Sequence, residues 1–126
     1  MSLVAPPLEL RIAGNAWQRL RGLLGHPAPP CGSGLWILRC RAVHTCGMRY
    51  PVDVAFLDCR GRVLRVARLA PWRAAWCRHA DSVVELRAGC LVAGAQGREW
   101  IESAVSRAMR AAGGVAPGSP PNAPCG

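Results

Sequence analysis

The chain has 126 residues, and because a domain typically has roughly 100 to 200, we predict one domain and exclude a two-domain architecture. Hydrophobic residues make up 51% of the chain, which is enough for a compact core and argues against wholesale disorder. All 16 basic residues are Arg and the net charge is +9, which indicates a compositional bias toward Arg. A polyanion partner is one explanation of this charge, and a solvated basic surface is the simpler alternative.

The N-terminal part of the chain predicts an extension, a strand and a helix. Residues 1–7 form the extension, which ends in two prolines. Apolar residues alternate with polar ones over residues 8–13, the pattern of a half-buried strand. Asn15 can cap a helix whose apolar residues continue at helical spacing to Gly25, where a glycine ends it. Residues 26–34 read as a Pro/Gly loop.

From Gly34 onward, short apolar segments alternate with turn residues, which predicts strands over residues 35–38, 42–46, 52–57, 62–69 and 82–86. Asp58 to Gly61 predicts a hairpin loop, since Asp can hydrogen-bond its own turn and Gly can adopt a positive φ. Residues 71–80 are predicted to be a connection without regular structure.

The C-terminal part predicts a helix over residues 99–112 followed by a disordered Pro/Gly tail over residues 113–126. Ile101 and Val105 share one face of this helix, and Glu99 and Glu102 are expected near its start, where they would complement the helix dipole. The predicted fold class is mainly β. It is a compact single domain over residues 8–112, with a sandwich or barrel-like sheet, a short N-terminal helix and a C-terminal helix.

The sequence also bears on location and redox state. No stretch approaches the roughly 18 consecutive apolar residues of a membrane span, and the N-terminus lacks a basic region followed by an apolar run and a cleavage site. We therefore expect a soluble cytoplasmic protein with no membrane partner. The seven cysteines are odd in number and contain no C-x-x-C pair, which excludes a complete internal disulfide framework. Most of them are expected to be small buried thiols.

The densest group of chemically active side chains spans residues 40–53. If residues 40–48 are extended, Cys40, Ala42, His44, Cys46 and Met48 point to one face, and His44 and Cys46 become neighbours. Imidazole and thiolate can bind zinc or form a nucleophilic dyad. A structural zinc site uses four ligands, usually in two close pairs, and the second pair is missing. We assign no metal, no cofactor and no catalytic residue, and a core histidine beside inert thiols is the simpler alternative.

Two carboxylates interrupt apolar runs. Asp53 shares its side of the strand with Ala55 and Leu57, so on an inward face its carboxylate would need a partner. If it pairs with His44 across adjacent strands, it would orient the imidazole and raise its pKa. Glu85 lies in a second apolar run, where an exposed edge-strand face explains it at least as well as a polar site.

Arginines interleaved with aromatic residues form a second candidate surface. Phosphates could pair with the guanidinium groups while bases stack on the rings. We nevertheless favour the alternative in which the two tryptophans pack beneath a long loop and the arginines are solvated. The residues of this candidate nucleic-acid surface are Arg60, Arg62, Trp72, Arg73, Trp76 and Arg78.

Several ordered motifs resemble the Domain of Unknown Function 192 family. Its core signature is similar to residues 43–48 (VHTCGM), followed by 51–58 (PVDVAFLD) and 61–63 (GRV). Two outer pieces agree, namely residues 21–24 (RGLL) and 84–89 (VELRAG). The resemblance covers about residues 8 to 95 and implies a compact β-rich domain with a helix near its N-terminus. It implies no activity.

Three functional hypotheses follow. The leading one is a small non-catalytic domain that binds a small molecule or a protein through a polar site around His44, Asp53 and Glu85, with Cys46 and Met48 as further candidate binding residues. The second is an enzyme or metal-dependent site in which His44 acts with Asp53 or Glu85, and whether the protein is an enzyme is left open. The third, a basic nucleic-acid-binding module, ranks below both.

Overall fold

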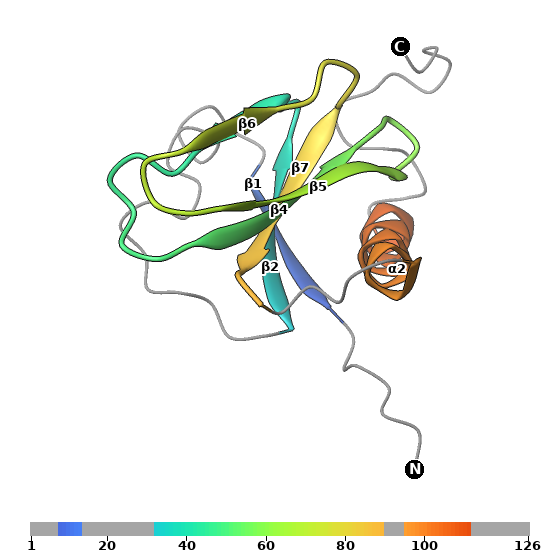
Figure 1. The fold of residues 1–126 in the computed structure, drawn as a ribbon. Helices are drawn as coiled ribbons and strands as arrows, with labels where there is room; N and C mark the ends of the chain where they lie inside the picture. Colours follow the sequence, from blue (N-terminus) through green and yellow to red (C-terminus); the bar gives the residue numbers. More distant parts are fainter. Residues whose placement is uncertain (1–7, 14–31, 90–94, 112–126) are drawn as a thin grey trace.

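The computed structural model describes residues 8–13, 32–89 and 95–111, and within them the chain forms seven strands and one helix (Figure 1). The predicted extension (1–7), the predicted helix from Asn15 to Gly25 and the predicted tail (113–126) lie outside the described residues. The elements are β1 (Glu9–Ala13), β2 (Ser33–Leu38), β3 (Ala42–His44), β4 (Val52–Leu57), β5 (Val63–Leu69), β6 (Ala74–Trp76), β7 (Ser82–Arg87) and α2 (Ala95–Ala111).

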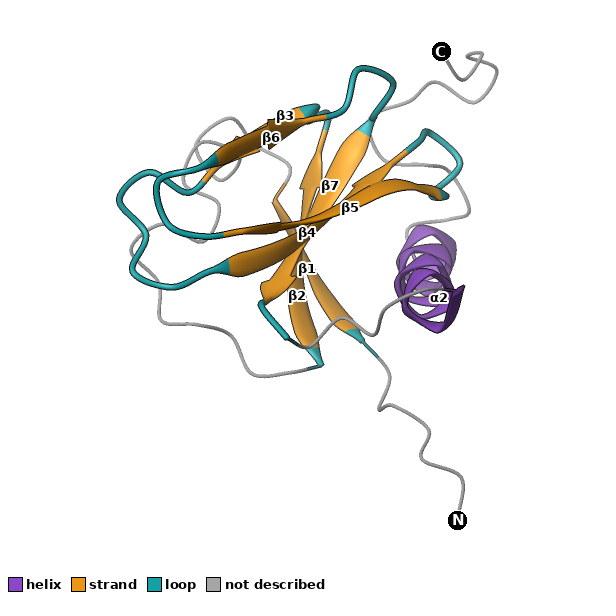
Figure 2. Ribbon diagram, in the orientation of Figure 1, coloured by secondary structure: helices purple, strands orange, loops and turns teal. Residues whose placement is uncertain are grey.

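The strands form two sheets. Five of them make a mixed sheet in the order β1-β2-β7-β4-β5, in which β1 runs parallel to β2 and the other neighbours are antiparallel. The short strands β3 and β6 pair antiparallel in a second sheet, which we call the β3–β6 sheet. The β3–β6 sheet and α2 lie on either side of the large sheet (Figure 2).

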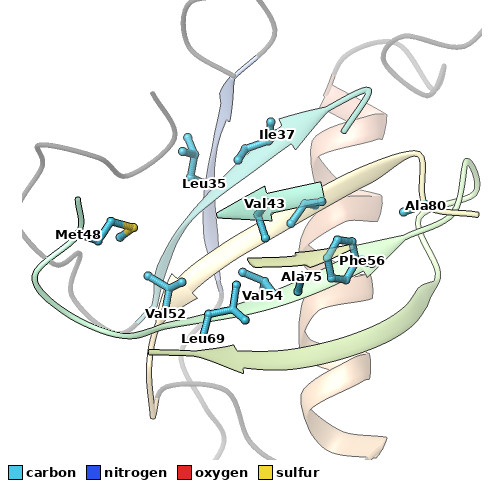
Figure 3. Close-up of a cluster of buried hydrophobic side chains, with 11 residues drawn as sticks. Leu35, Ile37, Val43, Met48, Val52, Val54, Phe56, Leu69, Ala75 and Ala80 are labelled. Atoms are coloured by element: carbon cyan, nitrogen blue, oxygen red, sulfur yellow. The ribbon is translucent and has the colours of Figure 1, made fainter. Parts of the chain in front are cut away.

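One face of the large sheet packs against the β3–β6 sheet. Val43 of β3 and Ala75 of β6 point inward and meet alternate residues of the large sheet, which form one continuous apolar cluster (Figure 3). Phe56 and Val83 are fully buried in it. The residues of this cluster are Leu35, Ile37, Val43, Met48, Val52, Val54, Phe56, Leu69, Ala75, Ala80 and Val83.

The opposite face packs against α2. The helix contributes Ile101, Ala104 and Val105 to this packing. They contact the sheet side chains that point away from the β3–β6 sheet, because successive side chains of a strand point to opposite faces. The sheet residues of this second cluster are Leu8, Trp36, Leu38, Ala55, Leu57, Val63, Val84 and Leu86. Because both faces are covered, β4 is buried along its whole length.

The hairpin between β4 and β5 adopts the predicted turn and contacts α2. Oδ1 of Asp58 accepts hydrogen bonds from the backbone N–H groups of Arg60 (2.9 Å) and Arg62 (3.0 Å), and Gly61 has a φ of +84°. Glu102 of α2 accepts a hydrogen bond from the N–H of Val63 through Oε2, at 2.9 Å. The glutamates do not lie in the first turn, because α2 begins at Ala95 instead of residue 99. The expected dipole role of Glu99 and Glu102 is therefore wrong.

The predicted mainly-β fold class is confirmed, and its form is a sandwich of two unequal sheets with a C-terminal helix. The strand predicted over residues 52–57 matches β4 at both ends. One strand was missed, because β6 lies inside the segment predicted as an irregular connection. Its single inward residue is Ala75, which gives almost no hydrophobic signal.

Replacing Gly61 by Ala is expected to destabilise the protein more than replacing Gly89, although both have a φ near +90° (+84° and +91°). A Cβ at Gly61 would lie 2.8 Å from Cγ1 of Val105 in α2, whereas one at Gly89 would meet nothing within 4 Å. We expect a loss of roughly 1–2 kcal/mol for G89A from backbone strain alone, and about 1–3 kcal/mol more for G61A from overpacking. Urea denaturation measures both, and equal losses would contradict the close packing of α2 on the hairpin.

Candidate functional site

A buried threonine joins two turns at one end of the β3–β6 sheet. The hydroxyl of Thr45 donates a hydrogen bond to the carbonyl of Ala70 (2.6 Å) and accepts one from the N–H of Arg73 (2.8 Å). The carbonyl of Thr45 accepts hydrogen bonds from the N–H groups of Met48 (3.1 Å) and Trp72 (3.0 Å). Thr45 therefore fixes the turn after β3 against the turn that precedes β6.

This turn separates the candidate residues that were expected to share a face. His44 and Cys46 are exposed, and Nδ1 of His44 accepts a hydrogen bond from the N–H of Cys46 at 3.3 Å. Met48 is buried in the cluster beneath the β3–β6 sheet. The expectation of one extended face over residues 40–48 is wrong, because β3 ends at His44 and Gly47, with a φ of +83°, reverses the chain.

The described cysteines also differ from expectation in part. Cys40 and Cys77 are partly buried and pack against the cluster beneath the β3–β6 sheet, whereas Cys46 is exposed. Cys59 is disulfide-bonded. Among these four, the expectation of small buried thiols is therefore met only in part, by the half-buried Cys40 and Cys77.

Asp53 is 2% exposed and pairs with Arg68 on the neighbouring strand, not with His44. Its Oδ1 accepts a hydrogen bond from Nε of Arg68 at 2.8 Å, and its Oδ2 accepts one from the N–H of Gly89 at 3.1 Å. The hydrogen bond and the charge of Asp53 both raise the pKa of the Arg68 guanidinium. The expectation that a buried Asp53 needs a partner is confirmed, and the partners tie β4 to β5 and to the end of β7.

Glu85 lies on the other face of the large sheet. In the register it stands opposite Val54 and Leu35, whereas Asp53 stands opposite Leu86, so the two carboxylates leave the sheet in opposite directions. Glu85 is 6% exposed on a central strand, so the edge-strand explanation is wrong. Burial, and next the charge of Glu85, raise the pKa of Tyr50 above 10.0. The structure thus does not gather His44, Asp53 and Glu85 into one pocket.

The outer face of the β3–β6 sheet and the turn that precedes β6 expose a different group of side chains. Ala42 pairs with Trp76 and His44 pairs with Ala74, and all four are exposed. Trp76 is 67% exposed, and Trp72, two residues before β6, is 66% exposed. The expectation that the two tryptophans pack beneath a loop is therefore wrong. We call Ala42, His44, Trp72, Arg73, Ala74 and Trp76 the tryptophan surface.

Arginines lie near the tryptophan surface. Nη1 of Arg65, on β5, donates a hydrogen bond to the carbonyl of Trp76 at 2.6 Å, which places this guanidinium beside β6. Arg78 follows Trp76 by two residues and is exposed. Between residues 39 and 80 the chain has nine arginines and two aspartates, and Asp53 and Asp58 both hold backbone or arginine partners.

The six candidate nucleic-acid residues therefore divide into two groups. Trp72, Arg73, Trp76 and Arg78 lie on or beside β6, whereas Arg60 and Arg62 lie in the hairpin that contacts α2. The sequence also placed Arg65 among the arginines of this candidate surface, and its hydrogen bond to the carbonyl of Trp76 brings it beside β6, apart from Arg60 and Arg62.

Within residues 8–13, 32–89 and 95–111, the structure gives less support to a metal site or to a pocket at the candidate residues. No three His, Cys, Asp or Glu side chains in these ranges gather closely enough to hold a metal ion. No helix in the same ranges combines the length and the apolar character needed to cross a membrane. A hollow runs along α2 and is lined by Glu99, Glu102, Ser103, Ser106, Arg107 and Arg110, away from the candidate residues.

Removing the hydroxyl of Thr45 is expected to destabilise the protein. Thr45→Val keeps the shape of the side chain but leaves the N–H of Arg73 and the carbonyl of Ala70 without this partner, which typically costs about 1–3 kcal/mol. Thr45→Ser keeps the hydroxyl and is the matched control. Urea denaturation should rank Thr45→Ser above Thr45→Val in free energy of unfolding, and the reverse order would contradict the proposed role of the hydroxyl.

The phenol of Tyr50, the only tyrosine of the chain, is expected to titrate above pH 10.0. As the pH rises, the unfolded chain loses this proton first, so the stability is complete below pH 10.0 and declines above it. Glu85→Gln should lower the pKa of Tyr50 only in part, because burial is the larger cause. Phenolate absorbance measures this pKa, with Glu102→Gln on α2 as the control. An unchanged pKa of Tyr50 in Glu85→Gln would contradict the effect of the Glu85 charge.

The fold is similar to that of two solved structures. One is a protein of unknown function from Novosphingobium aromaticivorans, with a TM-score of 0.59 and 18% identity over 65% of this chain and 64% of that one. The other, from Sinorhizobium meliloti, is described as a "putative transcription regulator" and has a TM-score of 0.60 and 22% identity over 67% of this chain and 71% of that one. The chain thus matches just under two thirds of the length of the Novosphingobium protein.

The sequence comparisons point to a family without an assigned activity. No curated protein matches the chain. Residues 4–95, which are more than half of the sequence, match the DUF192 family, described as an uncharacterized ACR. This range contains all seven strands and the motifs on which the resemblance rests. The chain belongs to the DUF192 family.

Proposed function

We propose that the protein is a non-catalytic binding domain that holds an anionic partner on its tryptophan surface. The observation that carries the proposal is the two-thirds exposure of both Trp72 and Trp76. A tryptophan can bury about 150–250 Å² of surface, so leaving two of them in water forgoes several kcal/mol of hydrophobic stabilisation. Exposed aromatic residues grouped on one surface are typical of interaction sites.

The charge around the tryptophan surface favours an anionic partner. The guanidinium groups of Arg65, Arg73 and Arg78 lie on or beside β6 and are exposed. A guanidinium presents several N–H donors in one plane, which suits phosphate and carboxylate groups. Asp53 is held by Arg68 and Asp58 by the turn between β4 and β5, and Asp81 is partly buried next to the start of β7.

Two other hypotheses, a polar binding pocket around His44 and an enzyme that uses His44, have less support than binding at the tryptophan surface. A small-molecule or catalytic site around His44 would need a neighbouring carboxylate, but Asp53 is engaged by Arg68 and Gly89. Glu85 is buried on the face of the large sheet that lies beneath the β3–β6 sheet, whereas His44 is exposed on the outer side of that sheet. The description of the Sinorhizobium meliloti protein as a transcription regulator is compatible with an anionic partner and concerns that protein alone.

Two double variants with the same net charge test the proposal. Arg73→Gln with Arg78→Gln removes two charges beside the tryptophan surface, and Arg98→Gln with Arg110→Gln removes two exposed charges from α2. The salt concentration that elutes each protein from immobilised heparin, an anionic probe, is measured. We expect earlier elution for the first double variant than for the second. Equal elution would mean that overall charge alone controls binding, and the proposal would be overturned.

A further inference from the structure

We infer that the anionic partner is a single-stranded nucleic acid whose bases stack on Trp72 and Trp76 while arginines contact its phosphates. This inference rests on the proposed function and narrows it to one class of partner. Proteins that bind single strands combine a positive surface with exposed aromatic rings, because every base offers a flat face for stacking. The tryptophan surface has both features within the short segment from Trp72 to Arg78.

Trp72 adopts a backbone conformation that its side chain disfavours. Its φ is +63°, in the left-handed region where a residue with a Cβ typically loses roughly 1–2 kcal/mol relative to Gly. The N–H of Trp72 donates to the carbonyl of Thr45 at 3.0 Å, so the turn holds this conformation. The indole itself is 66% exposed and contributes little to the core. The strained turn thus carries a large ring into solvent, where it is available to a partner.

Trp76 is equally accessible for a different reason. It ends β6, and its partner across the β3–β6 sheet is Ala42, whose small side chain leaves the ring uncovered. Its backbone carbonyl accepts the hydrogen bond from Arg65 at 2.6 Å, so a guanidinium lies beside the strand that carries the ring. Since a strand rises about 3.3 Å per residue, Trp72 and Trp76 lie within about 13 Å of each other along the chain. One short strand of nucleic acid can therefore reach both.

The composition of the tryptophan surface favours bases over an acidic protein. Protein interfaces place aliphatic and aromatic anchors together in a packed centre. The other exposed large apolar residues of the described chain are Ile12 on β1 and Leu64 and Val66 on β5, none of them on the β3–β6 sheet. The residues that pair with His44 and Trp76 across the β3–β6 sheet are alanines, so each of these two rings lies next to a small side chain. This arrangement suits stacking on unpaired bases, which a duplex keeps within its own stack.

The test measures the affinity for fluorescein-labelled single-stranded RNA and DNA of mixed sequence, about 12 nucleotides long, by anisotropy at roughly 50 mM salt. Trp76→Leu keeps an apolar side chain and removes the ring, whereas Trp76→Phe keeps a ring. We expect Trp76→Leu to weaken binding about 5- to 150-fold, as for the loss of one stacked base, and Trp76→Phe to bind closer to the original affinity. The same oligonucleotide as a duplex should bind more weakly than the single strand.

Trp72→Gly provides a second variant in which folding is not at risk. Gly accepts the positive φ at Trp72 without strain, so we expect the free energy of unfolding not to fall, while single-strand affinity decreases. Equal affinity of Trp76→Leu and the original protein for the single strand, or a preference for the duplex, would overturn the inference. If heparin still distinguishes the two arginine double variants, the proposed function survives that result. Absence of binding to both heparin and oligonucleotides would overturn both proposals.

Discussion

The double-sided burial of β4 and β7 is the constraint on which the rest of the structure depends. Both strands lie inside the five-stranded sheet, with the β3–β6 sheet over one face and α2 over the other. Every side chain of β4, and every one of β7 except that of the exposed Arg87, must therefore be accommodated within the protein. The apolar residues meet this constraint by alternating between the two clusters. Asp53 meets it by accepting hydrogen bonds from Arg68 and Gly89, since a buried carboxylate without partners is strongly unfavourable.

Because the inner strands of the large sheet are buried on both faces, exposed reactive side chains lie mainly on the layers that cover it, including the β3–β6 sheet. A three-residue pair of strands can bury only Val43 and Ala75, so the remaining side chains of β3 and β6 face solvent. The position of this small sheet depends on its connections more than on its core. Thr45 supplies several of them, because its hydroxyl and its backbone together bond to the turn that precedes β6. The tryptophan surface is therefore exposed yet held by a buried polar network.

The sequence predicted the large sheet far better than the site, for a physical reason. Val52–Leu57 is a partly β-branched run between Pro51 and Asp58 that is apolar except at Asp53, and such a run identifies a buried strand without knowledge of its neighbours. Whether Asp53 and Glu85 share a face depends on the register of two strands, which alternation within each strand does not reveal. The exposure of Trp72 and Trp76 depends likewise on a left-handed turn and on an alanine across the sheet. Residue type alone favours burial for tryptophan.

Arg65 connects the edge of the large sheet to the tryptophan surface. It lies on β5, an edge strand, on the same side as Ala67 and Leu69, which face the β3–β6 sheet. A charged side chain at that position cannot enter the cluster, so it extends past it and donates to the carbonyl of Trp76. One guanidinium N–H is used in this contact, and a guanidinium has five. The contact that joins the two sheets at this edge therefore also sets a guanidinium beside the backbone of the residue that carries the exposed indole, and guanidinium groups and aromatic rings together suit phosphate-bearing ligands.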